Sequence, residues 1–281
     1  MSYATSYKQS LEQPVEFWQQ QAQALAWFKM PTQTLDTSLV PKGLWFIDGE
    51  MNTCYMALDH HVAIYYDSPV TASRSSLTYS QLLAQVAAFA GALRQQGVLQ
   101  GDRVVIYMPI VMEAAIAMLA CARIGAVHSV VFGGFAATEL AVRINDARPK
   151  AIISASCGIE GAKVIAYKPL LGQALDIAEH QVKSVVILQR PQLTAQLKMG
   201  RDPDWLELMA QAEAVDAISV KATDSLYILY TLVTTGKPKG IVCDNGGHAV
   251  ALNYSMKAVY NMQAGDVFWA AVAPFCTKVS R

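Results

Sequence analysis

The sequence predicts an α/β fold in which mostly parallel sheets are layered with helices. From residue 63 onward, short apolar runs alternate with longer segments whose apolar residues recur at helical spacing. Apolar strands that alternate with helices are typical of a parallel sheet covered on both faces. The chain of 281 residues is 53% hydrophobic and only 16% charged, which suits a large buried core and argues against disorder.

The first 60 residues are predicted to form a leader region. Pro14 favours a helix that begins there, because proline is accommodated in the first helical turn. Asn52 is placed to cap a short helix at 53–59. The aromatic and apolar residues of the leader are expected to cover a neighbouring core, and they are Phe17, Trp18, Leu25 and Trp27.

The elements of the body follow from the same two patterns. Short apolar runs predict strands at 63–66, 77–79, 103–108, 128–132, 151–154, 184–188, 226–229, 241–243 and 267–271. Helical spacing predicts helices at 80–96, 111–124, 138–147, 167–180, 205–212 and 247–260. Ser80 is expected to cap the first of these helices, and Gly97 and Gly125 are placed to end two of them.

Composition disfavours several classes of function. Lys and Arg balance Asp and Glu at 22 each, which argues against nucleic acid or an anionic membrane as a partner. Pro109 and Glu113 interrupt the apolar stretch 104–122, so a strand followed by a helix is favoured over a membrane span. The five cysteines are scattered, and His60 and His61 lack further ligands nearby, so no disulfide framework or metal site is predicted. A cytoplasmic location is expected, because the N-terminus lacks the apolar core of a signal peptide.

Residues 230–240, YTLVTTGKPKG, carry the strongest chemical signal. They follow an apolar strand, and Pro238 prevents the loop from becoming a helix. Backbone N–H groups, threonine hydroxyls and lysine side chains on such a loop can bind a polyphosphate. The stretch is not a Walker-type loop, because Thr231 stands in the place of the first glycine and Pro238 in the place of the hydroxyl residue.

This stretch resembles the phosphate-binding loop of the AMP-forming acyl-CoA synthetases, with eight of the ten residues from Thr231 to Gly240 in common. The resemblance implies an incomplete N-terminal domain of the adenylate-forming fold. It also implies ATP with Mg²⁺ as a cofactor, coenzyme A as a co-substrate and a short-chain carboxylate as the acid. The ATP-binding residues that it implies are Thr231, Thr234, Thr235, Gly236, Lys237, Lys239 and Gly240.

A second segment, FGGF at 132–135, is by itself typical of a tight strand-to-helix turn. Together with the following RIND at 143–146, it resembles the coenzyme A site of acetyl- and propionyl-CoA synthetases. The resemblance implies that Gly133, Gly134 and Lys163 bind coenzyme A, while a solvated lysine is the alternative for Lys163. Residues 154–160 are more similar to the propionyl-CoA branch, so propionate is ranked before acetate.

The segment DNGGH at 244–248 continues the resemblance. His248 either faces the nucleotide or is a hydrogen-bonded structural histidine, and the second interpretation is favoured. Cys243 stands where the family usually has arginine, and it is expected to be an inert strand residue.

The resemblance departs from the family in two places. Leu232 and Val233 replace Ser-Gly, and residues 272–281 resemble nothing in the family. The expected organisation is an acetyl-CoA-synthetase-type extension at 1–60, a partial AMP-binding domain at 61–271 and an unrelated tail. The family's acyl pocket and catalytic lysine would lie further downstream, so a truncated and inactive ligase fragment is expected, with no catalytic residue assigned. A non-catalytic remnant or regulatory fragment that binds nucleotide or coenzyme A is the alternative, and a stand-alone amino-acid adenylation domain is a weaker one.

Overall fold

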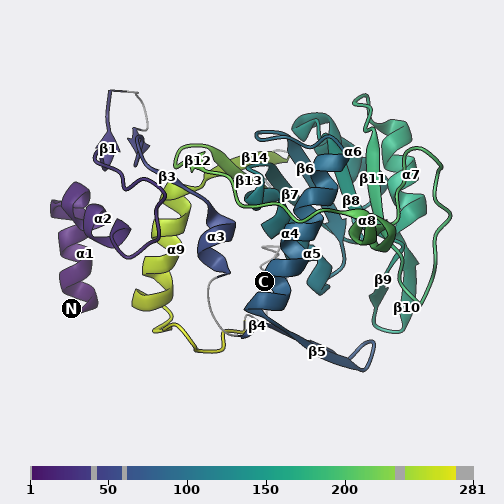
Figure 1. The fold of residues 1–281 in the computed structure, drawn as a ribbon, viewed down its shortest axis with the longest axis horizontal. Helices are drawn as coiled ribbons and strands as arrows, with labels where there is room; N and C mark the ends of the chain where they lie inside the picture. Colours follow the sequence, from purple (N-terminus) through teal and green to yellow (C-terminus); the bar gives the residue numbers. More distant parts are fainter. Residues whose placement is uncertain (1, 39–42, 59–61, 232–237, 270–281) are drawn as a thin grey trace.

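The computed structural model describes residues 2–38, 43–58, 62–231 and 238–269. Its centre is a six-stranded sheet in the order β11–β8–β6–β7–β13–β14 (Figure 1). All neighbouring strands are parallel except the last pair, β13 and β14, which is antiparallel. The predicted α/β fold with a mostly parallel sheet is therefore confirmed. The strands of this sheet are β6 (Arg103–Met108), β7 (Val127–Phe132), β8 (Ala151–Ala155), β11 (Ser184–Leu188), β13 (Ser225–Thr231) and β14 (Lys239–Asp244).

Helices cover both faces of the sheet, because its inner strands are apolar on both sides. In β6, Val104 and Ile106 belong to one buried cluster, whereas Val105 and Tyr107 belong to another. The first cluster includes residues of α4 (Tyr79–Gln95), α5 (Met112–Arg123) and α8 (Trp205–Gln211). The second includes residues of α6 (Ala137–Ala147) and α7 (Tyr167–Ile177). Apolar runs such as β6 thus fill two cores at once.

The leader lies to one side of the central sheet, at the left of Figure 1, and packs on α9 (Gly246–Ala258). The rings of Phe17 and Trp18 lie 5.2 and 5.6 Å from the ring of Tyr254. Trp18, Leu25 and Trp27 pack on a buried cluster that includes Val250 of α9, which confirms that leader residues cover a neighbouring core. The leader contains α1 (Tyr3–Glu12), α2 (Pro14–Ala22), α3 (Thr53–Ala57), β1 (Leu35–Asp36), β2 (Leu44–Trp45) and β3 (Glu50–Met51). Pairs outside the main sheet are β1–β2, β3 with β12 (Val220–Lys221), β4 (Val62–Ser68) with β5 (Ser73–Thr78), and β9 (Cys157–Glu160) with β10 (Lys163–Ala166).

Several predicted boundaries are wrong. The N-cap of α4 is Thr78 rather than Ser80, because the Thr78 hydroxyl accepts from the Gln81 amide and the Gln81 side chain accepts from the Thr78 amide. The helix predicted at 167–180 ends at Ile177, and residues 267–269 of the last predicted strand are not in a strand. No helix in the described part of the chain is long and apolar enough to span a membrane.

Candidate functional site

The two segments with predicted binding roles, the phosphate-binding loop and the Gly133–Gly134 turn, both begin at the carboxyl-terminal ends of strands in the central sheet. The strand β7 ends at Phe132, directly before Gly133, and β13 ends at Thr231, directly before the predicted phosphate-binding loop. Because β7 and β13 are parallel neighbours, their carboxyl ends lie side by side. Ligands of open α/β sheets bind at such strand ends, so the arrangement suits one shared site.

The predicted phosphate-binding loop is described only at its two ends. Thr234, Thr235, Gly236 and Lys237 lie outside the described residues. At the mouth of the loop, Thr231 pairs with Lys239 across the antiparallel β13–β14 ladder, and Tyr230 pairs with Gly240. Lys239 and Gly240 are exposed, which leaves the lysine ammonium and the loop mouth accessible to an anion.

The Gly133–Gly134 turn is held by Tyr107, a residue that was not predicted to matter. The Tyr107 hydroxyl accepts a hydrogen bond from the Gly134 amide at 3.4 Å and donates one to the Phe135 carbonyl at 3.1 Å. Burial raises the pKa of Tyr107, so its hydroxyl remains a donor. Gly134 has a φ of +108°, which a residue with a side chain rarely adopts. A hydroxyl at the end of an otherwise apolar strand was the sequence signal that could have identified Tyr107.

Glycine is required at position 133 because of close packing rather than because of its backbone dihedral angles. The phenol ring of Tyr167 fits between Gly133 and Gly158, and a Cβ atom at either glycine would overlap it. The rings of Tyr107 and Tyr167 lie 5.1 Å apart beneath the turn. This close packing matches the strand-to-helix turn that the sequence indicates.

Lys163 begins β10, and its side chain is exposed. It faces Glu160 across the β9–β10 hairpin, which is not recognisable from the sequence because its strands are short and only partly buried. The Glu160 carboxylate borders Gly134, since a Cβ atom there would lie 2.9 Å from Oε1. The hairpin therefore connects Lys163 to the Gly133–Gly134 turn.

Side chains of helix α6 contact residues next to the Gly133–Gly134 turn and residues next to the predicted phosphate-binding loop. The guanidinium carbon of Arg143 lies 4.8 Å from the centre of the Phe135 ring and 5.5 Å from that of Tyr230. One helical turn further on, Asp146 accepts a hydrogen bond of 2.5 Å from the Tyr230 hydroxyl. Arg143 and Asp146 were noted in the sequence only as part of a resemblance, because their common neighbour Tyr230 is distant along the chain.

His248 has the partners expected of a structural histidine. Its amide donates to Asp244 Oδ1 at 3.2 Å, and its Nδ1 lies 3.4 Å from the Tyr227 hydroxyl. Burial lowers the pKa of His248, which favours the neutral ring. Cys243 pairs with Tyr227 in the β13–β14 ladder, which agrees with a strand role.

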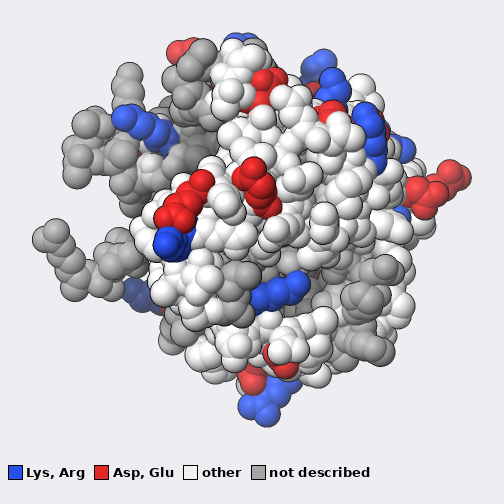
Figure 2. Space-filling view, turned by 90° about the vertical axis from the view of Figure 1, so that its left-hand side faces the viewer, with Lys and Arg blue, Asp and Glu red and all other residues white. Residues whose placement is uncertain are grey.

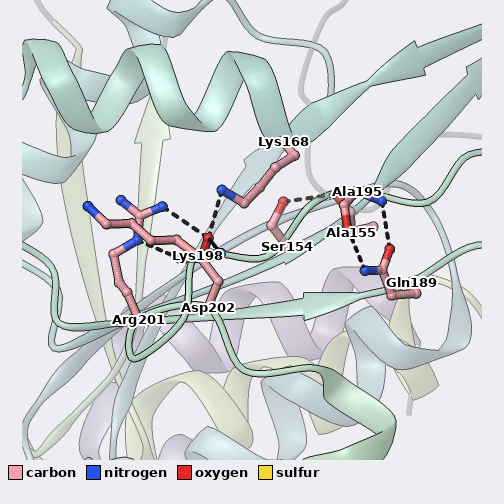
Figure 3. A network of polar contacts seen from close by, with 8 residues as sticks. All are labelled: Ser154, Ala155, Lys168, Gln189, Ala195, Lys198, Arg201 and Asp202. Carbon is pink, nitrogen blue, oxygen red and sulfur yellow. Dashed lines mark hydrogen bonds and ion pairs between the residues drawn. The ribbon is translucent and has the colours of Figure 1, made fainter.

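A buried ion cluster fastens α7, the helix that carries Tyr167 (Figure 3). The Asp202 carboxylate accepts from Lys168 Nζ at 2.8 Å, Arg201 Nε at 2.5 Å and the Lys198 amide at 2.9 Å. Its side chain is fully buried, whereas Lys168 is 15% exposed. The cluster anchors the chain after β11 to the first turn of α7.

Charged side chains are dispersed on one face of the molecule. On the face shown in Figure 2, acidic and basic side chains are scattered among uncharged residues. Within the described ranges, no group of three His, Cys, Asp or Glu residues could hold a metal ion.

Comparison with known proteins places these features in a family. Residues 58–280 match the model of AMP-binding enzymes, and residues 3–57 match the model of the acetyl-coenzyme A synthetase N-terminus. The chain is 46% identical over 278 residues to mouse (Mus musculus) acyl-CoA synthetase short-chain family member 3, mitochondrial, covering 96% of this chain and 41% of that protein. It is 42% identical over 280 residues to propionate–CoA ligase from Escherichia coli, covering 96% of this chain and 45% of that ligase.

A solved structure agrees with the sequence relatives. The acetoacetyl-CoA synthetase from Streptomyces lividans matches with a TM-score of 0.86 and 25% identity, over 95% of this chain and 42% of that enzyme. The chain thus spans less than half the length of these relatives. The match to AMP-binding enzymes includes most of the segment 272–281, which was expected to be an unrelated tail. The division of the chain at residues 60 and 271 stays a prediction. With a family model that covers residues 58–280, the chain belongs to the AMP-binding enzyme family.

Proposed function

We propose that the protein belongs to an AMP-forming short-chain acyl-CoA ligase, which converts an acid, ATP and coenzyme A to acyl-CoA, AMP and diphosphate. The observation that carries the proposal is the meeting of two strand ends, with Thr231 and Lys239 at one and the Gly133–Gly134 turn at the other. Relatives whose names state this chemistry, such as the propionate–CoA ligase, support it.

In the proposed first step, the carboxylate attacks the α-phosphorus of ATP, and negative charge builds on the leaving diphosphate. The hydroxyls of Thr231, Thr234 and Thr235, the backbone N–H groups of Gly236 and Gly240, and the ammonium groups of Lys237 and Lys239 would stabilise that charge. These donors fit a polyphosphate chemically, since all are cationic or hydrogen-bond donors. Mg²⁺, bound through the phosphates and water, would add positive charge at the same place.

In the proposed second step, the thiol of coenzyme A attacks the acyl-adenylate and releases AMP. Gly133 and Gly134 would present the backbone of the turn to coenzyme A, and the exposed Lys163 ammonium offers a partner for a coenzyme A phosphate. We rank propionate first as the acid because of residues 154–160, with acetate as the alternative.

A non-catalytic protein that binds nucleotide or coenzyme A is the second candidate function. The observation that favours it is the replacement of Ser-Gly by Leu232 and Val233. A β-branched residue held where glycine adopts a positive φ costs about 1–3 kcal/mol. We therefore infer that the 281-residue chain by itself has little adenylating activity.

Isotope exchange between ATP and diphosphate tests the two functions. The purified chain is assayed with propionate, acetate and no acid, while calorimetry measures the binding of Mg-ATP and coenzyme A. Propionate-dependent exchange that is lost in Lys237→Ala supports the ligase and overturns the inferred low activity. Binding of either ligand without exchange supports the second function, and the absence of all binding and exchange contradicts both.

A further inference from the structure

Arg143 is a buried cation in the middle of α6. The residue is 2% exposed, and Nη1 donates to the Glu139 carbonyl at 2.6 Å and to Glu139 Oε2 at 2.9 Å. A buried charge is costly unless it is paired. Glu139 supplies the paired charge, but its side chain is 49% exposed, so it does not account for the burial of the guanidinium.

Two aromatic rings account for that burial. The Arg143 guanidinium carbon lies 4.8 Å from the centre of the Phe135 ring and 5.5 Å from the centre of the Tyr230 ring. These distances are within the range of a cation–π interaction, which strengthens when the cation is removed from water. One guanidinium therefore contacts two aromatic residues, Phe135 and Tyr230, that are far apart in the chain.

Each of these two aromatic residues is adjacent in sequence to one of the two candidate binding segments. Phe135 follows Gly134, and its carbonyl accepts the hydrogen bond from Tyr107. Tyr230 precedes Thr231 at the end of β13, and its hydroxyl is held by Asp146 of the same α6. A shift of either segment would thus displace a ring from Arg143.

We propose that Arg143 is a positioning residue that couples the Gly133–Gly134 turn to the Thr231 end of β13. The assignment of these segments to coenzyme A and ATP rests on the function proposed above. The coupling makes the affinity for one ligand depend on the presence of the other. Arginine is suited to the role because its planar guanidinium can contact aromatic faces, whereas lysine supplies the charge without the plane.

Arg143→Lys is the discriminating variant, since it keeps the positive charge. Hydrogen–deuterium exchange is measured on the ligand-free 281-residue chain at the amides of Gly134, Phe135, Tyr230 and Thr231. We expect Arg143→Lys to accelerate exchange at both segments by about threefold to tenfold, in line with the strength of a desolvated cation–π contact. Arg94→Lys changes an exposed arginine of α4 and serves as the matched control, with no change expected.

Variants of one ring separate coupling from a general loss of stability. Tyr230→Leu removes the ring and should accelerate exchange at Gly134 and Phe135, whereas Tyr230→Phe keeps the ring and should leave those two amides unchanged. If Tyr230→Leu affects only its own strand, or if Arg143→Lys accelerates exchange uniformly over the chain, the coupling is wrong.

Ligand binding gives the second readout. The dissociation constant of coenzyme A is measured with and without saturating Mg-ATP, and the ratio is expected to differ from one in the unmodified chain and to return toward one in Arg143→Lys. An unchanged ratio in that variant overturns the proposal. If the unmodified chain binds neither ligand, the proposed function fails. The hydrogen–deuterium exchange measurement still decides whether Arg143 couples the two segments.

Discussion

Gly133 lies against the phenol ring of Tyr167 so closely that a Cβ atom at position 133 would overlap the hydroxyl, Cε2 and Cζ of the tyrosine. Tyr167 cannot easily move away, because its other side is packed on Gly158. The Gly133–Gly134 turn therefore has its shape set by a buried ring from α7.

Gly133→Ala is accordingly expected to lower the free energy of unfolding by about 1–3 kcal/mol, the usual cost of overpacking a core. Urea denaturation measures the effect. Gly172→Ala, in the same α7 but with open space around the new Cβ, should instead stabilise by roughly 0.5–1 kcal/mol. In a Tyr167→Leu background, Gly133→Ala should cost clearly less, and equal costs in both backgrounds would contradict the packing explanation.

Asp202→Asn tests the buried ion cluster. Burial by itself raises the pKa of Asp202, but hydrogen bonds from Arg201 and Lys168 outweigh it and lower the pKa below its usual value. Loss of the carboxylate charge leaves Lys168 and Arg201 without their partner, so we expect a destabilisation of about 2–4 kcal/mol. Asp67→Asn removes the exposed pair with Arg74 and should cost less than about 1 kcal/mol.

The same cluster makes stability depend on pH in the acid range. Because the pKa of Asp202 is lower in the folded chain, its contribution is complete above the usual value of 3.8 and is lost as the pH falls through the folded-state value. Asp202→Asn should therefore flatten the decline in unfolding free energy below pH 4 or so. An unchanged slope in the variant would show that Asp202 is not the titrating group.

The buried side chain of His128 leads us to expect a second pH dependence of the unfolding free energy, at higher pH than that of Asp202. Its Nδ1 is buried without a hydrogen-bond partner among the described atoms. Burial, followed by the nearby His248, lowers the pKa of His128 from 6.5 to about 4. The unfolded chain therefore binds the proton more readily, so stability is greatest above pH 6.5 and falls by up to about 3 kcal/mol as the pH approaches 4.

His128→Leu should remove most of this dependence, since it deletes the titrating ring while keeping an apolar side chain in β7. Unfolding free energies at pH 7, 5.5 and 4.5 provide the comparison. A His128→Leu profile parallel to that of the unmodified chain would rule out the assignment.

The double variant Leu232→Ser/Val233→Gly tests the departure from the family loop. Removing a cost of about 1–3 kcal/mol should tighten Mg-ATP binding by roughly fivefold to a hundredfold in calorimetry. The gain should disappear when Lys237→Ala is added, because we propose that this lysine supplies charge to the same phosphates. If the double variant binds Mg-ATP no more tightly than the unmodified chain, Leu232 and Val233 do not limit binding.

Local pattern determined most of the elements. The bounds predicted for the third and sixth strands, 103–108 and 184–188, are those of β6 and β11, because an apolar run buried on both faces is recognisable by itself. Both glycine-containing segments were correctly expected at strand ends. The hairpin β9–β10 was missed, because its four-residue strands alternate weakly and β9 is stabilised by its contact with α7.

Only the tertiary structure decided which distant residues meet. The sequence by itself indicated the α/β class, the loop chemistry and the resemblance to acyl-CoA synthetases, since these depend on residue type and spacing over short stretches. The strand order that makes β7 and β13 neighbours depends on how apolar faces pack over long separations. That order brings Tyr230 to the Arg143 guanidinium beside Phe135, whereas the packing of α7 places Tyr167 against Gly133.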